Sequence, residues 1–528
     1  MITALLLATA VAQDSADLHR AAVDAQVAFE RTRRAQLPLA ARIHAGGSRC
    51  EERIGRFCYW YNADDPPPPP EPASITTARD ALLTRLDSLA TLLPGDGWIA
   101  GQRVRYLLDA RRADEAVEVA TYCHAEPTTC RGLLGLALHA AGAAAAADRA
   151  FTAMLAGMDA TKRCEWTDLR LLLPSEEARR FRRLPCGERT EEAERLMALA
   201  DPLLGVEGNA FRGEFYARQV MAGLFEGTIS PHGTRFGSDQ REMMLRYGWP
   251  VAWSRTWSPD IMRDGSVVGH DPSPAWAFLA LDSRQPRWNL ARERARARAR
   301  PPSIAHIREF DEAQLARFPR RDQTLVVARW RAPDDSIFNG GPVRVVLAAG
   351  VHGSVGRAEQ PAESGQLGQA VLLVDGMPVL AGLEVGTEDG FSWARYRQGW
   401  ADVHEPGGTR LSDPLLFDAA SGEPQSLDLA LPVALPGTSV PRGGIVGVYW
   451  EAAVTAADSV TLRLLVRRDG NSRPRLSVSW RDAPGTDGMI RRGIALDLSR
   501  LGRGAHLLEL ELWDGGPPVR SVRRFVIE

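Results

Sequence analysis

The sequence has almost no lysine, and its basic residues are arginines with the single exception of Lys162. A P-loop requires lysine in a Gly-Lys-Ser/Thr turn, and pyridoxal phosphate enzymes require a lysine that forms a Schiff base. Lys162 lies in neither context. The chain also lacks a G-x-G-x-x-G dinucleotide motif and a calcium loop of alternating carboxylates. These absences exclude the corresponding enzyme classes and cofactors.

Motifs of hydrolytic enzymes are incomplete. The segment from His352 to Gly356 has histidine where the elbow of a serine hydrolase needs glycine. The segment beginning at His404 lacks the second histidine of a zinc protease and contains a proline that breaks helices. We therefore predict no catalytic residue, no metal site and no cofactor, and we favour a non-enzymatic role.

Strong net charge and long apolar runs are also missing. The formal net charge is −2 over 528 residues, which gives no global attraction to nucleic acid. No later segment approaches the roughly 20 apolar residues that cross a bilayer, so no transmembrane segment is predicted. With 45% hydrophobic and 25% charged residues, the composition is that of a globular protein of several domains.

The first twelve residues contain a short apolar run that ends in Ala10-Val11-Ala12, a pattern typical of a cleaved signal peptide (1–12). The basic residues that normally precede such a run are missing. An ordinary buried first helix therefore stays open as the alternative.

Cysteines are absent after Cys186, and the six present form three couples that are close in sequence. The simplest pairing is Cys50–Cys58, Cys123–Cys130 and Cys164–Cys186. Zinc is the competing interpretation, but no C-x-x-C or H-x-x-x-H spacing is present. Disulfides together with a signal peptide predict a periplasmic or secreted protein.

The region before residue 200 is predicted to be helical. Residues 13–63 contain an amphipathic helix, ended before Pro38, and a disulfide loop, and the proline run in 64–73 predicts a stiff linker. Residues 74–200 contain two similar units offset by about 34 residues, with bulky Trp98 and Leu133 and small Ala116 and Ala150. They resemble tetratricopeptide repeats. A plain helical bundle with an alanine-rich seam is the alternative.

Residues 201–290 contain spaced motifs, namely Asp201-Pro-Leu, Asn209, Arg212-x-Glu214-Phe-Tyr-x-Arg218, Ser238-Asp239 and Leu245-Arg-Tyr-Gly-x-Pro250. In this spacing the segment resembles the GWxTD domain family. It departs from that family at Arg235, Phe236 and Ser238, which replace glycine, tryptophan and threonine. The resemblance implies a domain of extracytoplasmic proteins, often beside β-sandwiches, with no assigned activity.

The same segment supplies the candidate binding residues, which are Glu214, Asp239, Arg246, Trp249, Trp253, Trp257 and His270. The carboxylates and arginines either pin a loop to a helix through ion pairs or provide an acid/base couple. The three tryptophans are four residues apart and would share one face of a helix. Such a face is either core or an exposed platform for sugars or a partner. His270 is either a site residue or a loop histidine bonded to local backbone.

The remainder is predicted to be β-structure. Residues 291–316 form an arginine-rich linker, and the arginine run from 290 to 302 is either solvated or binds an acidic envelope polymer. Short β-branched runs in 317–528, separated by glycine, proline and asparagine, predict one or two antiparallel immunoglobulin-like sandwiches.

The predicted fold is therefore multidomain α + β: a helical, tetratricopeptide-like half, a central α+β unit and a C-terminal antiparallel β-sandwich. Our first functional hypothesis is an exported, non-catalytic scaffold with a protein partner in the bacterial cell envelope. The alternative is an extracytoplasmic protein that binds or processes carbohydrate through the tryptophans with Glu214 and Asp239. Burial of the tryptophans would remove the main support for the glycan hypothesis.

Overall fold

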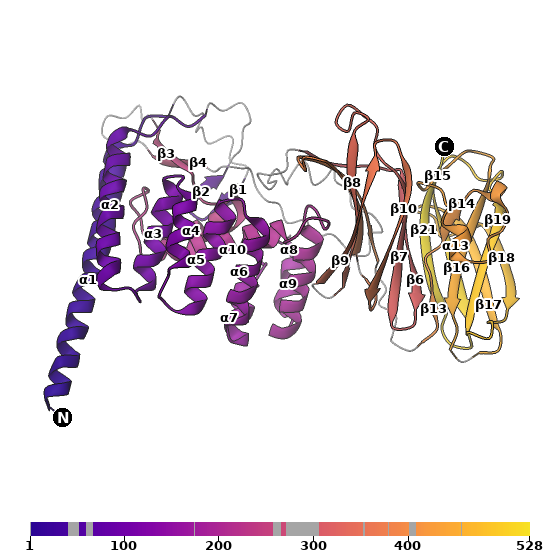
Figure 1. The fold of residues 1–528 in the computed structure, drawn as a ribbon, viewed down its shortest axis with the longest axis horizontal. Helices are drawn as coiled ribbons and strands as arrows, with labels where there is room; N and C mark the ends of the chain where they lie inside the picture. Colours follow the sequence, from indigo (N-terminus) through magenta and orange to yellow (C-terminus); the bar gives the residue numbers. More distant parts are fainter. Residues whose placement is uncertain are drawn as a thin grey trace. The chain divides into compact units, whose positions relative to one another are not determined.

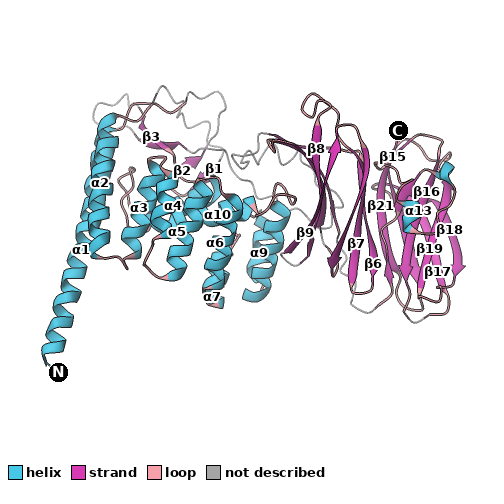
Figure 2. Cartoon of the chain, in the orientation of Figure 1, coloured by secondary structure: helices cyan, strands magenta, loops and turns pink. Residues whose placement is uncertain are grey.

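The computed structural model describes residues 2–40, 52–59, 67–173, 175–256, 266–270, 306–351, 354–378, 380–400, 408–455 and 457–528. They form two compact units (Figure 1). The helical unit holds the described residues up to Asp201 and those from Glu207 to His270. The β unit holds Pro202–Val206 and the described residues from 306 onward. Helices precede strands along the chain (Figure 2), which confirms the predicted multidomain α + β class.

The helices of the first unit are α1 (Ile2–Gln36), α2 (Ala73–Leu92), α3 (Gly97–Asp109), α4 (Ala113–Thr121), α5 (Pro127–Ala140), α6 (Ala144–Ala156), α7 (Ala160–Trp166), α8 (Ser175–Arg183), α9 (Cys186–Ala200), α10 (Ala210–Phe225) and α11 (Ser238–Tyr247). Helices α1 to α5 each pack against the next helix along the chain. As predicted, α1 ends before Pro38. None of the described helices is both long and apolar enough to cross a bilayer.

Helix α1 is held to the unit by a buried polar network. Tyr106 of α3 donates its hydroxyl to Glu30 at 2.7 Å and accepts from Gln26 at 2.9 Å. Arg33 pairs with Asp109 at the end of α3. Because these side chains are buried, the network fixes the position of α1 along α3. The helix already begins within the predicted signal peptide, whose cleavage stays a prediction.

The pairs α3–α4 and α5–α6 are two equivalent hairpins. Arg111 and Gly142 both adopt positive φ, at 59° and 80°, and each donates its N–H to the carbonyl three residues earlier. The equivalent residues are therefore 31 positions apart, rather than the predicted 34. At this offset Ala116 matches Ala147, and both are fully buried, so Ala147 rather than Ala150 is the small contact position.

Helix α10 lies at the centre of the helical unit and packs against α3, α5, α6, α9 and α11 (Figure 1). A Cβ atom at Gly101 of α3 would lie 2.5 Å from the Leu224 side chain of α10, so glycine permits the close approach of these helices. Because α10 is part of this core, the boundary predicted after residue 200 does not separate two compact units.

Two short hairpins complete the helical unit, β1 (Glu52–Ile54) with β2 (Phe57–Tyr59) and β3 (Ala252–Arg255) with β4 (Val267–His270). Leu39 forms a parallel bridge with Arg255, so the segment after α1 joins the β3–β4 hairpin. Residues 67–72 of the predicted linker form no helix or strand.

The β unit begins with one sandwich. Its strands are β5 (His306–Glu309), β6 (Ala313–Arg320), β7 (Gln323–Arg331), β8 (Pro342–Val351), β9 (Ser354–Glu363), β10 (Leu367–Asp375), β11 (Leu380–Thr387) and β12 (Ser392–Gly399). They form a three-stranded sheet, β10-β7-β6, and a five-stranded sheet, β5-β12-β11-β8-β9. Because β5 and the start of β6 lie before residue 317, the β-structure begins inside the predicted linker 291–316.

A second sandwich follows. Its elements are β13 (Arg410–Leu411), β14 (Leu415–Phe417), α13 (Leu427–Ala430), β15 (Ser439–Val440), β16 (Ile445–Ala453), β17 (Val460–Arg468), β18 (Pro474–Asp482), β19 (Met489–Asp497), β20 (Gly504–Trp513) and β21 (Val519–Ile527). One sheet centres on β16, and the other has the order β15-β21-β20-β17-β18. Each sandwich has its own apolar core. The open question of one or two sandwiches is thus answered as two.

A third apolar cluster lies between the two sandwiches. It contains Phe318 and Val327 from the first and Phe417 and Tyr449 from the second. Around it, buried side chains bond to backbone across the junction: Gln314 Nε2 donates to Leu416 O at 2.8 Å. The two sandwiches are therefore joined by a packed interface within one compact unit.

The junction also contains a buried ion pair between β6 and the loop before β14. Asp413 accepts hydrogen bonds from the backbone N and the side chain of Arg317, at 2.9 and 3.2 Å, and from Ser521 Oγ at 3.1 Å. Burial favours the neutral acid, but the charge and hydrogen bonds of Arg317 outweigh it and lower the pKa of Asp413. The carboxylate thus fixes β6, β21 and the β13–β14 loop together.

Candidate functional site

Glu214, the first candidate carboxylate, lies on α10 between an arginine and a histidine. Arg218 Nε, one turn later, donates to Glu214 Oε1 at 2.6 Å, and His139 Nε2 of α5 donates to Oε2 at 2.6 Å. The second edge of Arg218 donates to the carbonyls of Leu245 and Arg246 at 3.0 and 2.7 Å. The three side chains therefore connect α5, α10 and the end of α11.

The electrostatics of this cluster favour a permanently ionised Glu214. Burial acts to raise the pKa of Glu214, but the Arg218 charge and the hydrogen bond from His139 outweigh it and hold the pKa below its usual range. A general acid requires the opposite shift. The cluster is thus suited to joining helices, not to proton transfer near neutral pH.

Asp239, the second candidate carboxylate, lies at the start of α11 and binds the turn of the β1–β2 hairpin. Arg56 donates from Nε to Oδ2 at 2.6 Å and from Nη2 to Oδ1 at 2.8 Å. The hydrogen bond from Arg56 lowers the pKa of Asp239 to about 2. Glu214 and Asp239 thus have separate partners and do not form the acid/base couple that the sequence left open.

The tryptophans do not form a helical face. Helix α11 ends at Tyr247, Trp249 lies in the following loop, and Trp253 lies on strand β3, while Trp257 is outside the described residues. Trp253 is 9% exposed and packs edge-on against His232, with ring centroids 5.1 Å apart. The tryptophans would share a face only if this segment were helical, and that condition is not met, because Ala252–Arg255 form strand β3 and pair with β4.

Arg246 and His270 are engaged locally. Arg246 Nε donates to Leu171 O at 2.9 Å and forms an ion pair with Glu242 at 3.2 Å. His270 lies on β4, not in a loop, and its Nε2 is 2.7 Å from Ser254 Oγ on β3. Burial lowers the pKa of His270, so its neutral ring can accept the serine proton. Ser254 is fully buried, however, and the pair presents no accessible nucleophile.

The structure adds partners that the sequence did not identify. His139, Arg56 and His232 lie 75, 183 and 21 residues from Glu214, Asp239 and Trp253, respectively. Burial lowers the pKa of His232 to about 4, with nearby Arg34 and Arg56 adding to the effect. No sequence periodicity relates these three residues to their partners, so the contacts could be found only in the folded chain. Among the described residues, no group of three or more potential ligands could hold a metal ion.

Two of the three predicted disulfides are confirmed. Cys123–Cys130 connects the end of α4 to α5, and Cys164–Cys186 connects α7 to α9, with Cα atoms 5.6 and 5.7 Å apart. Cys50 lies outside the described residues, so the predicted Cys50–Cys58 pair stays a prediction.

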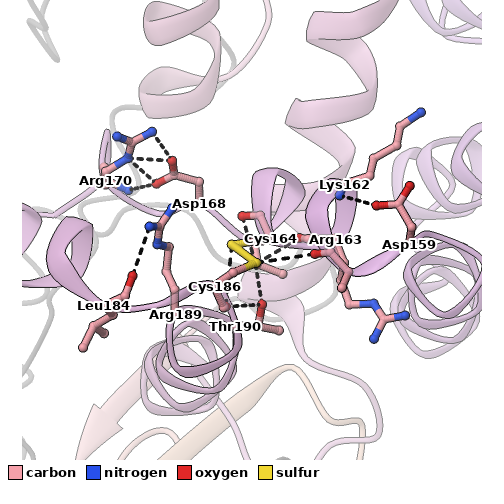
Figure 3. Close-up of a disulfide and its surroundings, with 12 residues drawn as sticks. Asp159, Lys162, Arg163, Cys164, Asp168, Arg170, Leu184, Cys186, Arg189 and Thr190 are labelled. Carbon is pink, nitrogen blue, oxygen red and sulfur yellow. Dashed lines mark hydrogen bonds and ion pairs between the residues drawn. A yellow bond between two sulfur atoms is a disulfide. The ribbon is translucent and has the colours of Figure 1, made fainter.

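The only lysine lies near the second disulfide. Figure 3 shows the bridge beside Thr190, whose hydroxyl donates to Cys186 O at 3.2 Å. The backbone N of Lys162 donates to Asp159 at 2.8 Å, and the lysine side chain extends away from the disulfide (Figure 3). It therefore takes no part in a described cluster of acids or nucleophiles.

No family model and no curated protein matches the chain. Among solved structures, a red sea bream transglutaminase aligns with it at 10% identity, over 63% of this chain and 45% of that chain, with a TM-score of 0.15. The chain thus spans less than half of that protein's length. A likeness of this size defines neither fold nor activity, and the GWxTD resemblance stays a prediction.

Proposed function

We propose that this chain is an exported, non-catalytic scaffold that binds another protein of the bacterial cell envelope. The observation that carries the proposal is an exposed apolar row on strand β10. Leu367, Val371 and Leu373 are 41%, 51% and 49% exposed. Val371 and Leu373 are successive outward positions, and the polar Gln369 lies between them and Leu367. Exposed apolar residues gathered on one protein surface are typical of an interaction site.

The row faces away from the sandwich core. Ala370 and Val374 alternate with it and are each 7% exposed in the core, so the odd-numbered residues of β10 point outward. Val371 lies opposite Val327 of β7, which belongs to the apolar cluster between the sandwiches. The exposed residues of β10 thus lie on the same sheet face as Val327, and at Val327 this face is covered by the second sandwich. Among the described residues, strand β10 pairs with β7 alone, so it lies at the edge of its three-stranded sheet.

The rigid junction supports a scaffold role. Besides Gln314 and Arg317, Arg329 of β7 donates to Pro432 O at 3.0 Å, and Arg523 of β21 donates to Leu315 O of β6 at 2.6 Å. These buried arginines use charged donors on backbone carbonyls, which leaves little freedom for the sandwiches to move against each other. A rigid pair of sandwiches presents a binding strand at lower entropic cost.

The chemistry of the candidate carboxylates argues against an enzyme. Glu214 and Asp239 are each held ionised by an arginine, and each joins separate elements of the helical unit. The glycan hypothesis loses one of its three tryptophans, because Trp253 is buried against His232. Trp249 is half-buried, and Trp257 lies outside the described residues. An extracytoplasmic location is supported by the two disulfides and by the GWxTD resemblance.

The test is site-specific photo-crosslinking in source cells. A photo-crosslinking amino acid at Gln369, an exposed position within the row, is expected to capture one protein partner. Capture is expected to be lost in Val371→Ser/Leu373→Ser and retained in the control Ile445→Ser/Val478→Ser, which removes exposed apolar residues of the second sandwich. Equal capture by both variants, or capture of no defined protein, would contradict the proposal.

A further inference from the structure

One sheet face of the second sandwich carries an excess of arginine. We name it the arginine face; its basic residues are Arg463 and Arg467 of β17, Arg475 and Arg481 of β18, and Arg520 and Arg524 of β21. On β17, Leu462, Leu464 and Val466 are buried in the core, so the odd-numbered residues point outward. The register continues this face across the sheet, because Arg463 lies opposite both Ser479 of β18 and Glu511 of β20.

Two carboxylates at the centre of the arginine face hold the surrounding guanidinium groups. Glu509 and Glu511 are 8% and 4% exposed. Arg520 Nε lies 2.9 Å from Glu511 and 3.7 Å from Glu509, and Arg467 lies 3.2 Å from Glu509. The side chain of Arg520 is 56% exposed, so its remaining donors face solvent while one edge is held. The glutamates thus preorganise the arginines for an anionic ligand.

The positive charge exceeds what the sheet uses for its own ion pairs. Arg475 and Arg481 lie exposed on β18, the edge strand, and form no ion pair within the described part of the chain. Arg524 of β21 pairs with Asp469, in the turn between β17 and β18, at 2.9 Å. The face therefore holds six arginines against three carboxylates, whereas the whole chain has a formal net charge of −2.

The geometry points to an extended ligand with repeated anionic groups. Neighbouring strands are about 4.8 Å apart, and outward residues on one strand are about 7 Å apart. A flat array of arginines at this spacing can bind successive carboxylates through paired hydrogen bonds. The hydroxyl of Ser477, on the outward side of β18, accepts from Arg463 Nε at 3.4 Å and adds a neutral donor suited to sugar hydroxyls, whereas Ser479 donates to Leu462 O at 3.2 Å.

The number of aromatic residues on the arginine face helps to decide whether its ligand is a nucleic acid or a polysaccharide. Single-stranded nucleic acid is bound on several aromatic side chains that stack successive bases. Here the outward positions of β17, β18, β20 and β21 include one aromatic residue, Trp513, which lies opposite Thr461 at the rim. A single indole is enough to stack one sugar ring. We infer that the arginine face binds an acidic polysaccharide.

The test measures binding of the full-length protein to polygalacturonate, a carboxylate-bearing polysaccharide, with neutral dextran and a single-stranded oligonucleotide as comparison ligands. The double variant Arg475→Gln/Arg481→Gln removes exposed, unpaired charge and is expected to leave the thermal midpoint unchanged. We expect its affinity for polygalacturonate to fall about tenfold, because each arginine contact releases counterions. Affinity of the unmodified protein is expected to fall with increasing salt.

A matched control removes the same charge elsewhere. Arg179→Gln/Arg183→Gln changes two exposed arginines of helix α8 and is expected to retain the affinity. Equal loss in both double variants, equal binding of dextran, or tighter binding of the oligonucleotide would each overturn the inference. Because β10 is unchanged in these variants, the outcome is independent of the proposed protein-binding role.

Discussion

Arg56 and Asp239 form a two-point ion pair that joins the turn of the β1–β2 hairpin to the first turn of α11, at 2.6 and 2.8 Å. The carboxylate also accepts the N–H of Gln240 at 2.9 Å, so it stabilises the start of the helix. One side chain of α11 thereby positions a hairpin whose arginine lies 183 residues earlier in the chain. The pair therefore has a structural role, because it connects the β1–β2 hairpin to α11. This role explains why Asp239 is charged although it has no catalytic partner.

The first prediction concerns this pair. Asp239→Asn keeps the shape but removes the charge, and we expect it to lower the unfolding free energy by no more than about 1 kcal/mol, because charges at helix ends and exposed ion pairs contribute little. The pKa of Asp239 is lowered to about 2 in the folded chain, so its contribution is full above the unfolded pKa and lost as pH falls toward 2. Urea unfolding at pH 7 and pH 3 should show the variant differing less at pH 3.

The second prediction concerns Glu214. Glu214→Gln leaves Arg218, which is 3% exposed, without its counter-charge, and we expect a loss of about 3 kcal/mol in unfolding free energy. Glu207→Gln is the matched control, because the Glu207–Arg149 pair is 73% and 65% exposed and should contribute almost nothing. Thermal and urea unfolding of both variants checks the difference. Similar losses in the two would contradict a structural role for Glu214.

The third prediction concerns His232. Its pKa is lowered to about 4 by burial, so the folded chain resists protonation that the unfolded chain accepts near pH 6.5. Stability is therefore full above pH 6.5 and falls between pH 6.5 and 4, by about 2 kcal/mol from pH 7 to pH 5 for this residue. His232→Gln should flatten that part of the profile. His124→Gln, at an exposed histidine, should leave the profile unchanged.

The fourth prediction concerns Glu384, which is fully buried in the five-stranded sheet. Its carboxylate accepts the N–H groups of Leu204 and Gly205 at 2.8 and 2.6 Å and pairs with Arg397 at 3.3 Å. We expect Glu384→Ala to cost about 3 to 5 kcal/mol, since it removes the carboxylate that pairs with the buried Arg397 and accepts two backbone N–H groups.

The same substitution should accelerate hydrogen exchange at the amides of Leu204 and Gly205, because both lose their acceptor. The control Glu359→Ala removes a carboxylate that is 53% exposed and 3.5 Å from Arg344. It should change neither exchange nor stability appreciably. Unchanged exchange in Glu384→Ala would show that other contacts protect the segment.

The fifth prediction compares the disulfides. Cys164 and Cys186 are 22 residues apart, whereas Cys123 and Cys130 are 7 apart. The larger loop restricts the unfolded chain more, so double alanine variants should lose about 3 and about 2 kcal/mol respectively. The measurement is the unfolding free energy of both variants with and without reductant. Reductant should lower the stability of each variant only through the disulfide that the variant still contains.

Much of the fold could be predicted from local sequence. The strand at Gln323–Arg331 follows from its β-branched run, and the end of α1 at Gln36 follows from Pro38. The two observed disulfides follow from short spacing, because nearby cysteines meet at little entropic cost. These features depend on backbone preferences and burial within one segment.

The candidate site was less predictable, and Trp253 shows why. A spacing of four suggested a helical face, yet a turn at Gly248 and pairing with Gly269 place Trp253 on a strand. Strand β5 shows the same limit, since it pairs in parallel with β12, some 86 residues away in sequence. Such strand pairings depend on contacts between segments that are distant in sequence, so local sequence does not predict them.

By itself, the sequence determined the order of helices and strands, the local disulfides and the lack of several catalytic motifs. Only the tertiary structure decided that Glu214 and Asp239 have separate partners, that Trp253 is buried, and that arginines from three strands share one face. The physical reason is that periodicity and turn residues act over a few positions. Ion pairs and exposed surfaces arise from residues that meet only after the chain has folded.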